Sequence, residues 1–341
     1  MEVFINGTGL ISPQPLFEES KFSIDLLESF TKSRLKCIEP DYKEFINPTQ
    51  LRRMSRMIKM GIAASKICLK NAGVENPDAI ITGTGLGCIE DTEKFILSII
   101  DNDEKHLSPT PFIQSTHNTV GGQIALLLGC HAYNSTYVHR GLSFESALLD
   151  AAMLLEEQSA ENILVGGLDE ITDNSFKLLS ELGSYSRKES VGLELSNGVI
   201  GGEGATFFLL SGEKTIKSLA KITALKCYTG SSELSTITAK IKECMLEAGK
   251  GIDAIDLILL GKSGNRKTDN IYSDLKNGLF RNSKTQTFKQ FCGEYHTASA
   301  FALWLASMLI GNSLSSSSPS SVLIYNHFGG EEHSILLVER C

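Results

Sequence analysis

Short apolar runs alternate with longer stretches of helical periodicity along almost the whole chain of 341 residues. Apolar runs of four to eight residues are typical of buried strands, whereas apolar residues three and four positions apart are typical of helices that cover a sheet. Residues 52–72, for example, predict a helix with Gly73 as its C-cap, and residues 79–81 predict a strand before the glycine-rich turn 83–87. This alternation restricts the fold to sheets covered by helices, the α/β class.

Two segments of the chain share one order of elements. Residues 137–167 and 291–330 each read as strand, turn, helix, loop and strand, and each ends in a pair of glycines. We infer a duplicated α/β unit, with an N-terminal half over residues 1–212 and a C-terminal half over residues 213–341. The serine-rich stretch 313–321 predicts a surface loop and not a domain linker, because apolar elements flank it closely. The predicted strands are residues 3–9, 79–81, 135–138, 162–165, 205–210, 222–228, 257–260, 287–291, 322–326 and 334–339, and the predicted helices are residues 52–72, 90–100, 121–128, 143–157, 236–248, 269–279 and 297–309.

Charge and hydropathy exclude several classes of partner. The formal net charge is −8 without a basic stripe, which argues against nucleic acid and against anionic lipid as partners. No apolar run reaches the roughly 18 residues that a membrane span needs, and no basic segment precedes the apolar N-terminal residues as in a signal peptide. We therefore expect a cytoplasmic protein with no membrane contact.

The cysteines and the glycine-rich turn indicate neither a metal nor a cofactor. The eight cysteines form no CxxC pair and no other metal-ligand spacing, so we expect reduced, buried thiols. The turn at residues 83–87 matches neither the dinucleotide pattern GxGxxG nor the P-loop pattern. Its glycines fit better with close backbone packing than with phosphate binding.

Seven motifs, taken in order, resemble those of the β-ketoacyl-ACP synthases, the condensing enzymes of fatty-acid and polyketide synthesis. The resemblance covers nearly the whole chain. The motifs are the long helix at residues 52–73, the turn GTGLGCIED at 83–91, QSTHNTVGG at 114–122, LVGGLDE at 164–170, GEGA at 202–205, KQFCG at 289–293 and NHFGG at 326–330.

The resemblance implies a thiolase-like fold, in which two similar α/β halves form five αβαβα layers and the subunit dimerises. It places Ser115, Thr116 and Asn118 near the dimer interface. In this family a cysteine at a strand–helix turn takes the acyl chain from an acyl carrier protein. Two histidines then assist decarboxylation of malonyl-ACP and stabilise the enolate and the thioester oxyanion.

The chain departs from this pattern at all three catalytic positions. The family's spacing puts the nucleophile 12 residues after Gly129 and 25 residues before Gly166, and both counts reach Gly141. The aspartate of the family's HGT....D element corresponds to Asp269, which puts Gly261 at the first histidine position. The second histidine follows KxxxG, where Glu294 stands, and a negative charge there would repel an enolate.

Other family positions are kept. Lys289 matches the family's lysine, and Phe328 corresponds to its gating phenylalanine, followed by Gly329 and Gly330. Glu203 belongs to the GEGA motif. The resemblance assigns these residues to the substrate tunnel or to its structural support.

Residues close to the altered positions are candidates for a relocated nucleophile or base. Ser143 lies two residues after Gly141, and a serine–histidine pair would need hydrogen-bond reach. His296 and Cys292 flank Glu294, and a buried cysteine packs more often than it reacts. The remaining histidines in polar surroundings, His106, His131 and His333, are predicted to be surface residues.

The loss of all three catalytic residues on a retained scaffold favours a non-catalytic subunit. Chain-length factors are such members of this family: they lack the cysteine, pair with an active ketosynthase and help shape the acyl tunnel. We therefore expect a chain-length-factor-like subunit of a type II fatty-acid, polyketide or aryl-polyene synthase, with an active ketosynthase as partner and an acyl carrier protein as indirect client. The alternatives are an active 3-oxoacyl-ACP synthase or acyltransferase with a relocated nucleophile, and a homodimeric module that binds acyl chains.

Overall fold

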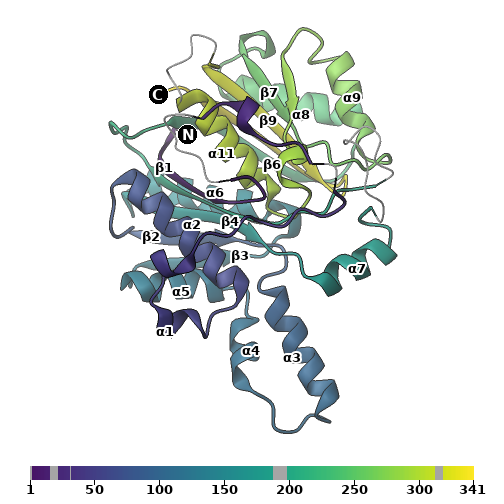
Figure 1. Ribbon diagram of the computed structural model, residues 1–341. Coiled ribbons are helices and arrows are strands. Elements are labelled where there is room, and N and C mark those ends of the chain that lie inside the picture. The colour runs from purple at the N-terminus through teal and green to yellow at the C-terminus, as the bar shows by residue number, and fades with distance from the viewer. Residues whose placement is uncertain (1, 16–21, 31, 187–197, 312–317) are drawn as a thin grey trace.

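A computed structural model describes residues 2–15, 22–30, 32–186, 198–311 and 318–341 (Figure 1). Within them, ten strands form one sheet in the order β3-β2-β4-β5-β1-β6-β10-β9-β7-β8. The strands are β1 (Val3–Ile11), β2 (Ala79–Gly83), β3 (Tyr133–Tyr137), β4 (Asn162–Asp169), β5 (Gly204–Ser211), β6 (Ala220–Thr229), β7 (Leu257–Leu260), β8 (Thr285–Thr287), β9 (Ser321–Phe328) and β10 (Glu332–Glu339).

Eleven α-helices are assigned in the described part of the chain. They are α1 (Pro48–Leu51), α2 (Arg56–Ala72), α3 (Ile89–Asp101), α4 (Pro109–Gln114), α5 (Thr119–Leu128), α6 (Ser143–Glu156), α7 (Asp173–Glu181), α8 (Leu234–Glu247), α9 (Asn270–Asn277), α10 (Lys289–Cys292) and α11 (Ala298–Gly311). Among the described residues, no helix combines the length and the apolar character that crossing a membrane requires.

The first and second halves of the sheet, β1–β5 and β6–β10, have the same strand order and the same directions. In the first half β2 pairs in parallel with β3 and β4, and β5 lies antiparallel between β4 and β1. In the second half β7 pairs in parallel with β8 and β9, and β10 lies antiparallel between β9 and β6. The antiparallel pair of β1 and β6, with Val3 opposite Ile222, joins the two halves.

Three large clusters make up most of the hydrophobic core and define five layers, and a small fourth cluster contains Leu35 and Ile200. The central cluster contains α6 and α11 together with the facing sides of both sheet halves, for example Ile81 and Ile324. A second cluster packs α2 and α5 on the outer side of the first half, where Ile80 points, and a third packs α8 and α9 on the outer side of the second half. In Figure 1, α6 and α11 accordingly lie in the middle of the molecule. The expected αβαβα fold is therefore confirmed.

Helix α11 is apolar on all sides, and its side chains are almost completely buried. A helix without a polar face is stable only inside a protein, which is why this segment lies in the central layer. Helix α6 carries the other half of this layer, with Phe144, Leu148 and Leu155 buried against the sheet.

Several predicted elements differ from the observed ones. The strand predicted at residues 287–291 is wrong, because β8 ends at Thr287 and residues 289–292 form the helical turn α10. Phe288 and Phe291 are both buried, and a spacing of three places them on one side of a helical turn. Helix α7 was not predicted, and of the serine-rich loop predicted at 313–321, residues 313–317 lie outside the described residues.

Helices α3 and α4 form a hairpin that extends away from the rest of the molecule (Figure 1). The rings of Phe95 and Phe112 hold the two helices together, with centroids 5.1 Å apart. At the base of the hairpin, the carboxylate of Glu170 accepts a hydrogen bond from the backbone N–H of Glu90 at 3.1 Å. The hairpin exposes large apolar side chains, namely Ile96, Leu97, Ile100, Phe112 and Ile113.

Glycines in β1 allow α2 to lie directly on the strand. A Cβ atom at Gly9 would lie 2.0 Å from the carbonyl oxygen of Ala64 and 2.6 Å from the amide nitrogen of Cys68, both backbone atoms of α2. We expect Gly9→Ala to lower the free energy of unfolding by about 3 kcal/mol or more, since neither backbone can yield locally. Gly122→Ala is the matched control, because a Cβ there meets nothing within 4 Å and a helix favours alanine over glycine. Equal urea midpoints for the two variants would contradict this packing.

Burial raises the pKa of Glu170 to about 8 from the ordinary value of 4.5. The folded chain thus holds this proton more tightly than the unfolded chain, so its contribution to stability is present below about pH 4.5 and falls as the pH rises toward 8. We expect Glu170→Gln to flatten this part of the stability profile, measured by calorimetry from pH 5 to 9. Glu75→Gln, which removes an exposed carboxylate, controls for the change in net charge. Parallel profiles for both variants and the parent chain would refute the assignment.

Candidate functional site

The position that the resemblance assigns to the nucleophile lies at the start of a buried helix. Gly141 belongs to a single 3₁₀ turn, Arg140–Leu142, between β3 and α6. Arg140 has a left-handed backbone with φ of 49°, which makes the turn sharp. Free N–H groups and the helix dipole favour negative charge at such a helix start, so the location suits a reactive anion even though glycine supplies none.

The space beside Gly141 is filled. A Cβ atom built on this residue would lie 2.2 Å from Cβ of Phe328 and 2.8 Å from Oε2 of Glu332. Both distances are shorter than real Cβ contacts, so even an alanine would require the neighbours to move. Position 141 therefore lacks both a nucleophile and the room for one.

The first histidine position is filled in a similar way. Gly261 follows β7, and a Cβ there would lie 2.1 Å from Oδ1 of Asn326 and 3.0 Å from the hydroxyl of Tyr272. Asp269, the kept aspartate, accepts hydrogen bonds from the backbone N–H groups of Ser263 and Gly264 at 2.9 and 2.6 Å. The aspartate thus holds the loop after β7 in place, and no imidazole fits beside it.

Glu294, at the second histidine position, forms a buried ion pair with Lys289. The Nζ atom of Lys289 lies 2.8 Å from Oε2 of Glu294 and also donates to the carbonyl of His327 at 3.2 Å. Burial raises the pKa of Glu294, and the adjacent ammonium group of Lys289 opposes that rise. Where the resemblance leads us to expect an imidazole, this chain therefore has a buried lysine–glutamate ion pair.

Ser143 is the first residue of α6, and its hydroxyl makes only backbone hydrogen bonds. It donates to the carbonyl of Arg140 at 2.7 Å and accepts from the backbone N–H of His139 at 2.8 Å. The His139 ring faces Ser146 instead, with Nδ1 3.3 Å from that hydroxyl. A serine nucleophile needs a general base on its hydroxyl, and the partners of Ser143 are backbone groups only.

Cys292 and His296 lie on either side of Glu294. The Cys292 thiol is completely buried, and burial raises its pKa. A protonated, inaccessible thiol is a poor nucleophile. His296 is partly exposed and packs on the ring of Phe328, with centroids 4.4 Å apart. The three candidates for relocated chemistry are therefore not brought together as a nucleophile and base.

Glu203, of the GEGA motif, ties the N-terminal segments to the sheet. Both of its carboxylate oxygens accept hydrogen bonds from the guanidinium group of Arg56, at 2.6 and 2.7 Å. They also accept from the backbone N–H groups of Cys37 and Ile171, at 2.8 and 3.0 Å. With four hydrogen bonds inside the protein, Glu203 stabilises the fold and offers no free group to a substrate.

Asp169 is an important residue that sequence reasoning missed. One carboxylate oxygen accepts from the backbone N–H of Gly85 at 2.8 Å and from the Thr84 hydroxyl at 3.0 Å. The other accepts from the N–H and the hydroxyl of Thr297, at the start of α11. The sequence feature that could have indicated its role is its place in LVGGLDE, where Asp169 is the first acidic residue after the apolar strand and its two glycines.

The glycine-rich turn at residues 83–87 packs closely, as predicted. A Cβ at Gly83 would lie 2.4 Å from the carbonyl oxygen of Ser143, and one at Gly85 would lie 2.1 Å from the His296 ring. Gly87 has a left-handed φ of 66°. The turn therefore brings the start of α6 and the segment before α11 together.

The prediction for His333 is wrong, whereas His106 and His131 are exposed as expected. His333 is completely buried, stacked on Tyr228 at 4.6 Å and hydrogen-bonded through Nδ1 to the hydroxyl of Tyr325 at 3.0 Å. Its neighbours in sequence are polar, but β10 turns alternate residues into the third core cluster. Burial lowers the pKa of His333 to about 4, so the ring is neutral at pH 7.

The three residues predicted at a dimer interface lie between α4 and α5. Thr116 and Asn118 are exposed, and Ser115 is partly exposed. The hydroxyls of Ser115 and Thr116 donate to carbonyl groups of α4 at 2.8 and 3.1 Å, which shapes the link between the hairpin and α5. They border the apolar side chains that the hairpin exposes.

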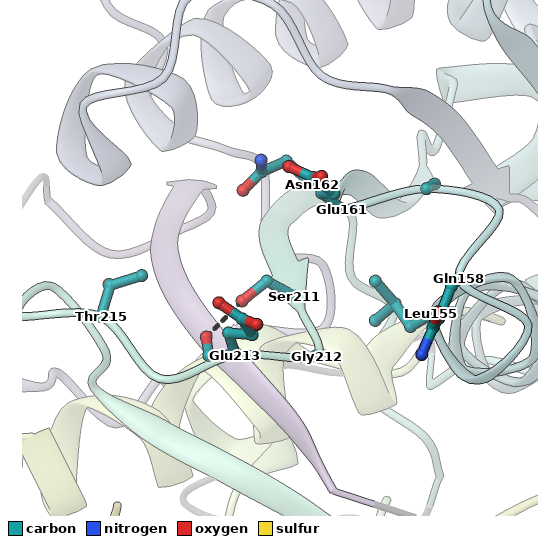
Figure 2. A pocket seen from close by; sticks show the side chains of 9 residues that line it. Leu155, Gln158, Glu161, Asn162, Ser211, Gly212, Glu213 and Thr215 are labelled. Atoms are coloured by element: carbon teal, nitrogen blue, oxygen red, sulfur yellow. Dashed lines mark hydrogen bonds between the residues drawn. The ribbon is translucent and has the colours of Figure 1, made fainter.

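A cavity of about 690 Å³ lies near the start of β4, at the end of this strand that is opposite to Asp169 (Figure 2). It is bordered by the start of β4 at Asn162 and the end of β5 at Ser211, whereas Asp169 and the altered positions lie at the other end of β4. Its lining includes Glu161 and Glu213, and the Ser211 hydroxyl there donates to the backbone carbonyl of Glu213 (Figure 2). Across the described chain, no group of three or more His, Cys, Asp or Glu residues is arranged to hold a metal ion.

Comparison with known families matches residues 33–220 to the N-terminal domain of β-ketoacyl synthases. No curated protein matches the chain. The matched segment contains Gly141 and the start of α6.

Solved structures share the whole fold at low sequence identity. The ishigamide ketosynthase/chain length factor has a TM-score of 0.79 and 16% identity, over 100% of this chain and 99% of that one. A β-ketoacyl synthase from Burkholderia phymatum STM815 has a TM-score of 0.79 and 15% identity, with the same coverage. A ketosynthase in complex with its chain length factor from Xenorhabdus doucetiae has a TM-score of 0.74 and 15% identity, over 99% of this chain and 98% of that one.

The Lys289–Glu294 pair supports a prediction about stability. Lys289→Met leaves the Glu294 carboxylate buried without its cation, and we expect a loss of about 3–5 kcal/mol in the free energy of unfolding. The double variant Lys289→Met/Glu294→Leu removes both charges and should recover most of this loss. Lys240→Met, which breaks an exposed ion pair with Glu243, is the control and should cost no more than about 1 kcal/mol. Equal losses for the two single lysine variants in urea unfolding would argue against a stabilising buried pair.

Proposed function

The chain belongs to the β-ketoacyl synthase family, and we propose that it is a non-catalytic, chain-length-factor-like subunit of a type II fatty-acid, polyketide or aryl-polyene synthase. In this role it pairs with an active β-ketoacyl-ACP synthase that supplies the cysteine and both histidines. An acyl carrier protein delivers the substrate to that partner. The proposal also includes a division of the chain into two halves, with the boundary after residue 212. It further includes a location in the cytoplasm, which agrees with the eight free thiols.

The observation that carries the proposal is the packing at the catalytic positions. Gly141 and Gly261 face side chains that fill the space of a thiol and an imidazole, and Glu294 is engaged by Lys289. A recent loss of one catalytic residue would leave a cavity, whereas here the neighbours have closed both glycine positions. This closure favours a scaffold role over residual condensation chemistry.

The partner surface we propose comprises β3, the adjoining side of α6 and the α3–α4 hairpin. Strand β3 is an edge of the sheet, paired only with β2 among the described strands, and its residues are partly or fully exposed. Unpaired strand edges are templates for another chain. Met153 on α6 and the apolar residues of the hairpin are also exposed. Exposed large apolar side chains are typical of subunit interfaces, and we propose that these residues belong to one such interface.

The proposed contribution to the product is steric. Apolar walls at the subunit interface would bury the growing acyl chain at about 0.8 kcal/mol per CH₂, until the wall ends and elongation stops. Two similar structures are named as a ketosynthase with a chain length factor, the ishigamide protein and the Xenorhabdus complex, which supports the pairing of two such subunits.

Co-expression tests the pairing. We expect the chain to co-purify 1:1 with a ketosynthase that carries Cys-His-His and is encoded near its gene, and light scattering should give the mass of a heterodimer. Ile113→Asp should weaken this pairing by at least about tenfold, since a charge is desolvated in the interface. Leu246→Asp is the matched control: its side chain is 79% exposed on α8, away from the hairpin.

Two outcomes would contradict the non-catalytic role with a ketosynthase partner, and each would support one of the alternatives. A homodimer that ignores every candidate ketosynthase would support an acyl-binding module. A covalent acyl adduct on Ser143 or Cys292, found by mass spectrometry after incubation with acyl-ACP, would identify an enzyme with a relocated nucleophile.

A further inference from the structure

The hairpin between β9 and β10 fills the vacant catalytic position from the second half of the chain. Phe328, at the end of β9, puts its Cβ and Cγ atoms 2.2 and 2.6 Å from where a Cβ on Gly141 would lie. Glu332, at the start of β10, puts Oε2 2.8 Å from the same point. Glu332 lies 191 residues after Gly141 in sequence, and Phe328 lies on the same hairpin.

Glu332 also occupies the hydrogen-bonding capacity of the turn. Its Oε2 accepts the backbone N–H of Gly141 at 2.9 Å, and the residue is 8% exposed. Its other oxygen lies 3.7 Å from the guanidinium group of Arg140. A carboxylate at a helix start is stabilised by the free N–H groups and the helix dipole. The anion that this helix start favours is therefore supplied by the protein.

Phe328 is held from the opposite side. Its ring packs on His296 with centroids 4.4 Å apart, and His296 in turn lies against Gly85 of the glycine-rich turn. The hairpin turn beyond it, with left-handed Gly329 and Gly330, is fixed by a hydrogen bond from the Ser232 hydroxyl to the carbonyl of Gly330. Movement of Phe328 away from Gly141 would require several contacts to break together.

We propose that Phe328 and Glu332 form an internal plug that seals the former acyl site of this subunit. Phe328 takes the space of the reactive side chain, and Glu332 takes the N–H that would polarise a thioester carbonyl during acyl transfer. With Phe328 and Glu332 in place, only glycine fits at position 141. A cysteine introduced there by itself therefore gives no reactive thiol. The inference rests on the proposed non-catalytic role: with this site sealed, an acyl group in the complex is carried by the partner's thiol.

The plug makes separate steric and electrostatic predictions. A cysteine at position 141 would be crowded by Phe328 and would lie beside the negative charge of Glu332, which raises the pKa of a thiol. Removing Phe328 should therefore restore access, and removing the charge of Glu332 should shift reactivity to lower pH.

Alkylation by iodoacetamide of the thiol introduced at position 141, resolved by peptide mass spectrometry, measures both effects. We expect Gly141→Cys/Phe328→Gly to react at least about tenfold faster than Gly141→Cys. Adding Glu332→Gln to the double variant should lower the midpoint of the pH–rate profile. Glu331→Gln, which removes the exposed neighbouring carboxylate, should shift it less. Equal rates for the first pair, or equal midpoints for the two glutamine variants, would overturn the plug.

A stability cycle keeps the proposal testable where a cysteine variant fails to fold. Gly141→Ala adds one methyl group, and we expect a lower unfolding midpoint that Phe328→Gly partly restores. Additive effects of the two substitutions, or no effect of Gly141→Ala, would contradict the plug. These measurements use the isolated chain, so a failed co-expression would leave the plug standing, and a failed plug would leave the pairing with a ketosynthase standing.

Discussion

The burial of two helices, α6 and α11, between the halves of one sheet is the constraint on which the rest of the structure depends. A buried helix start exposes N–H groups that have no water to bind, so the protein must satisfy them itself. Glu332 on β10 accepts the N–H of Gly141 before α6, and Asp169 on β4 accepts the N–H of Thr297 before α11. Each carboxylate comes from the sheet half opposite to its helix in sequence, so the two caps link the halves reciprocally.

The same constraint explains why catalytic positions can be lost without loss of the fold. In an acyl-transfer enzyme, a free helix start is useful because it stabilises a developing negative charge. Here the start of α6 is used for stability. Lys289 follows the same logic, because Glu294 neutralises it where the family has an imidazole. Charge balance and helix capping thus hold the halves together without any of the three family residues.

The sequence predicted most of the layers but not the contacts that close the site. The apolar stretch at residues 297–309 predicted α11, because it is too long for a buried strand and α11 is apolar on all sides. Motif spacing assigned Gly141 and Gly261 to two catalytic positions, and this assignment stays a prediction. The sequence pattern could not predict the contact of Glu332 with Gly141, because the two residues are 191 positions apart. It also could not predict that His333 is buried, because its neighbours in sequence are polar. The short strand β8 was misplaced because Phe288 and Phe291 are buried by a helical turn.

Two regions of the first half of the chain differ in how far their polar and apolar groups are already buried. At the start of α6, polar groups are satisfied internally and the space at position 141 is filled. At the β3 edge and along the α3–α4 hairpin, backbone groups and apolar side chains are exposed. Burying the exposed set lowers the free energy only through association, while opening the closed set costs packing and hydrogen bonds. This difference supports the proposal that the chain gains stability by binding a partner subunit.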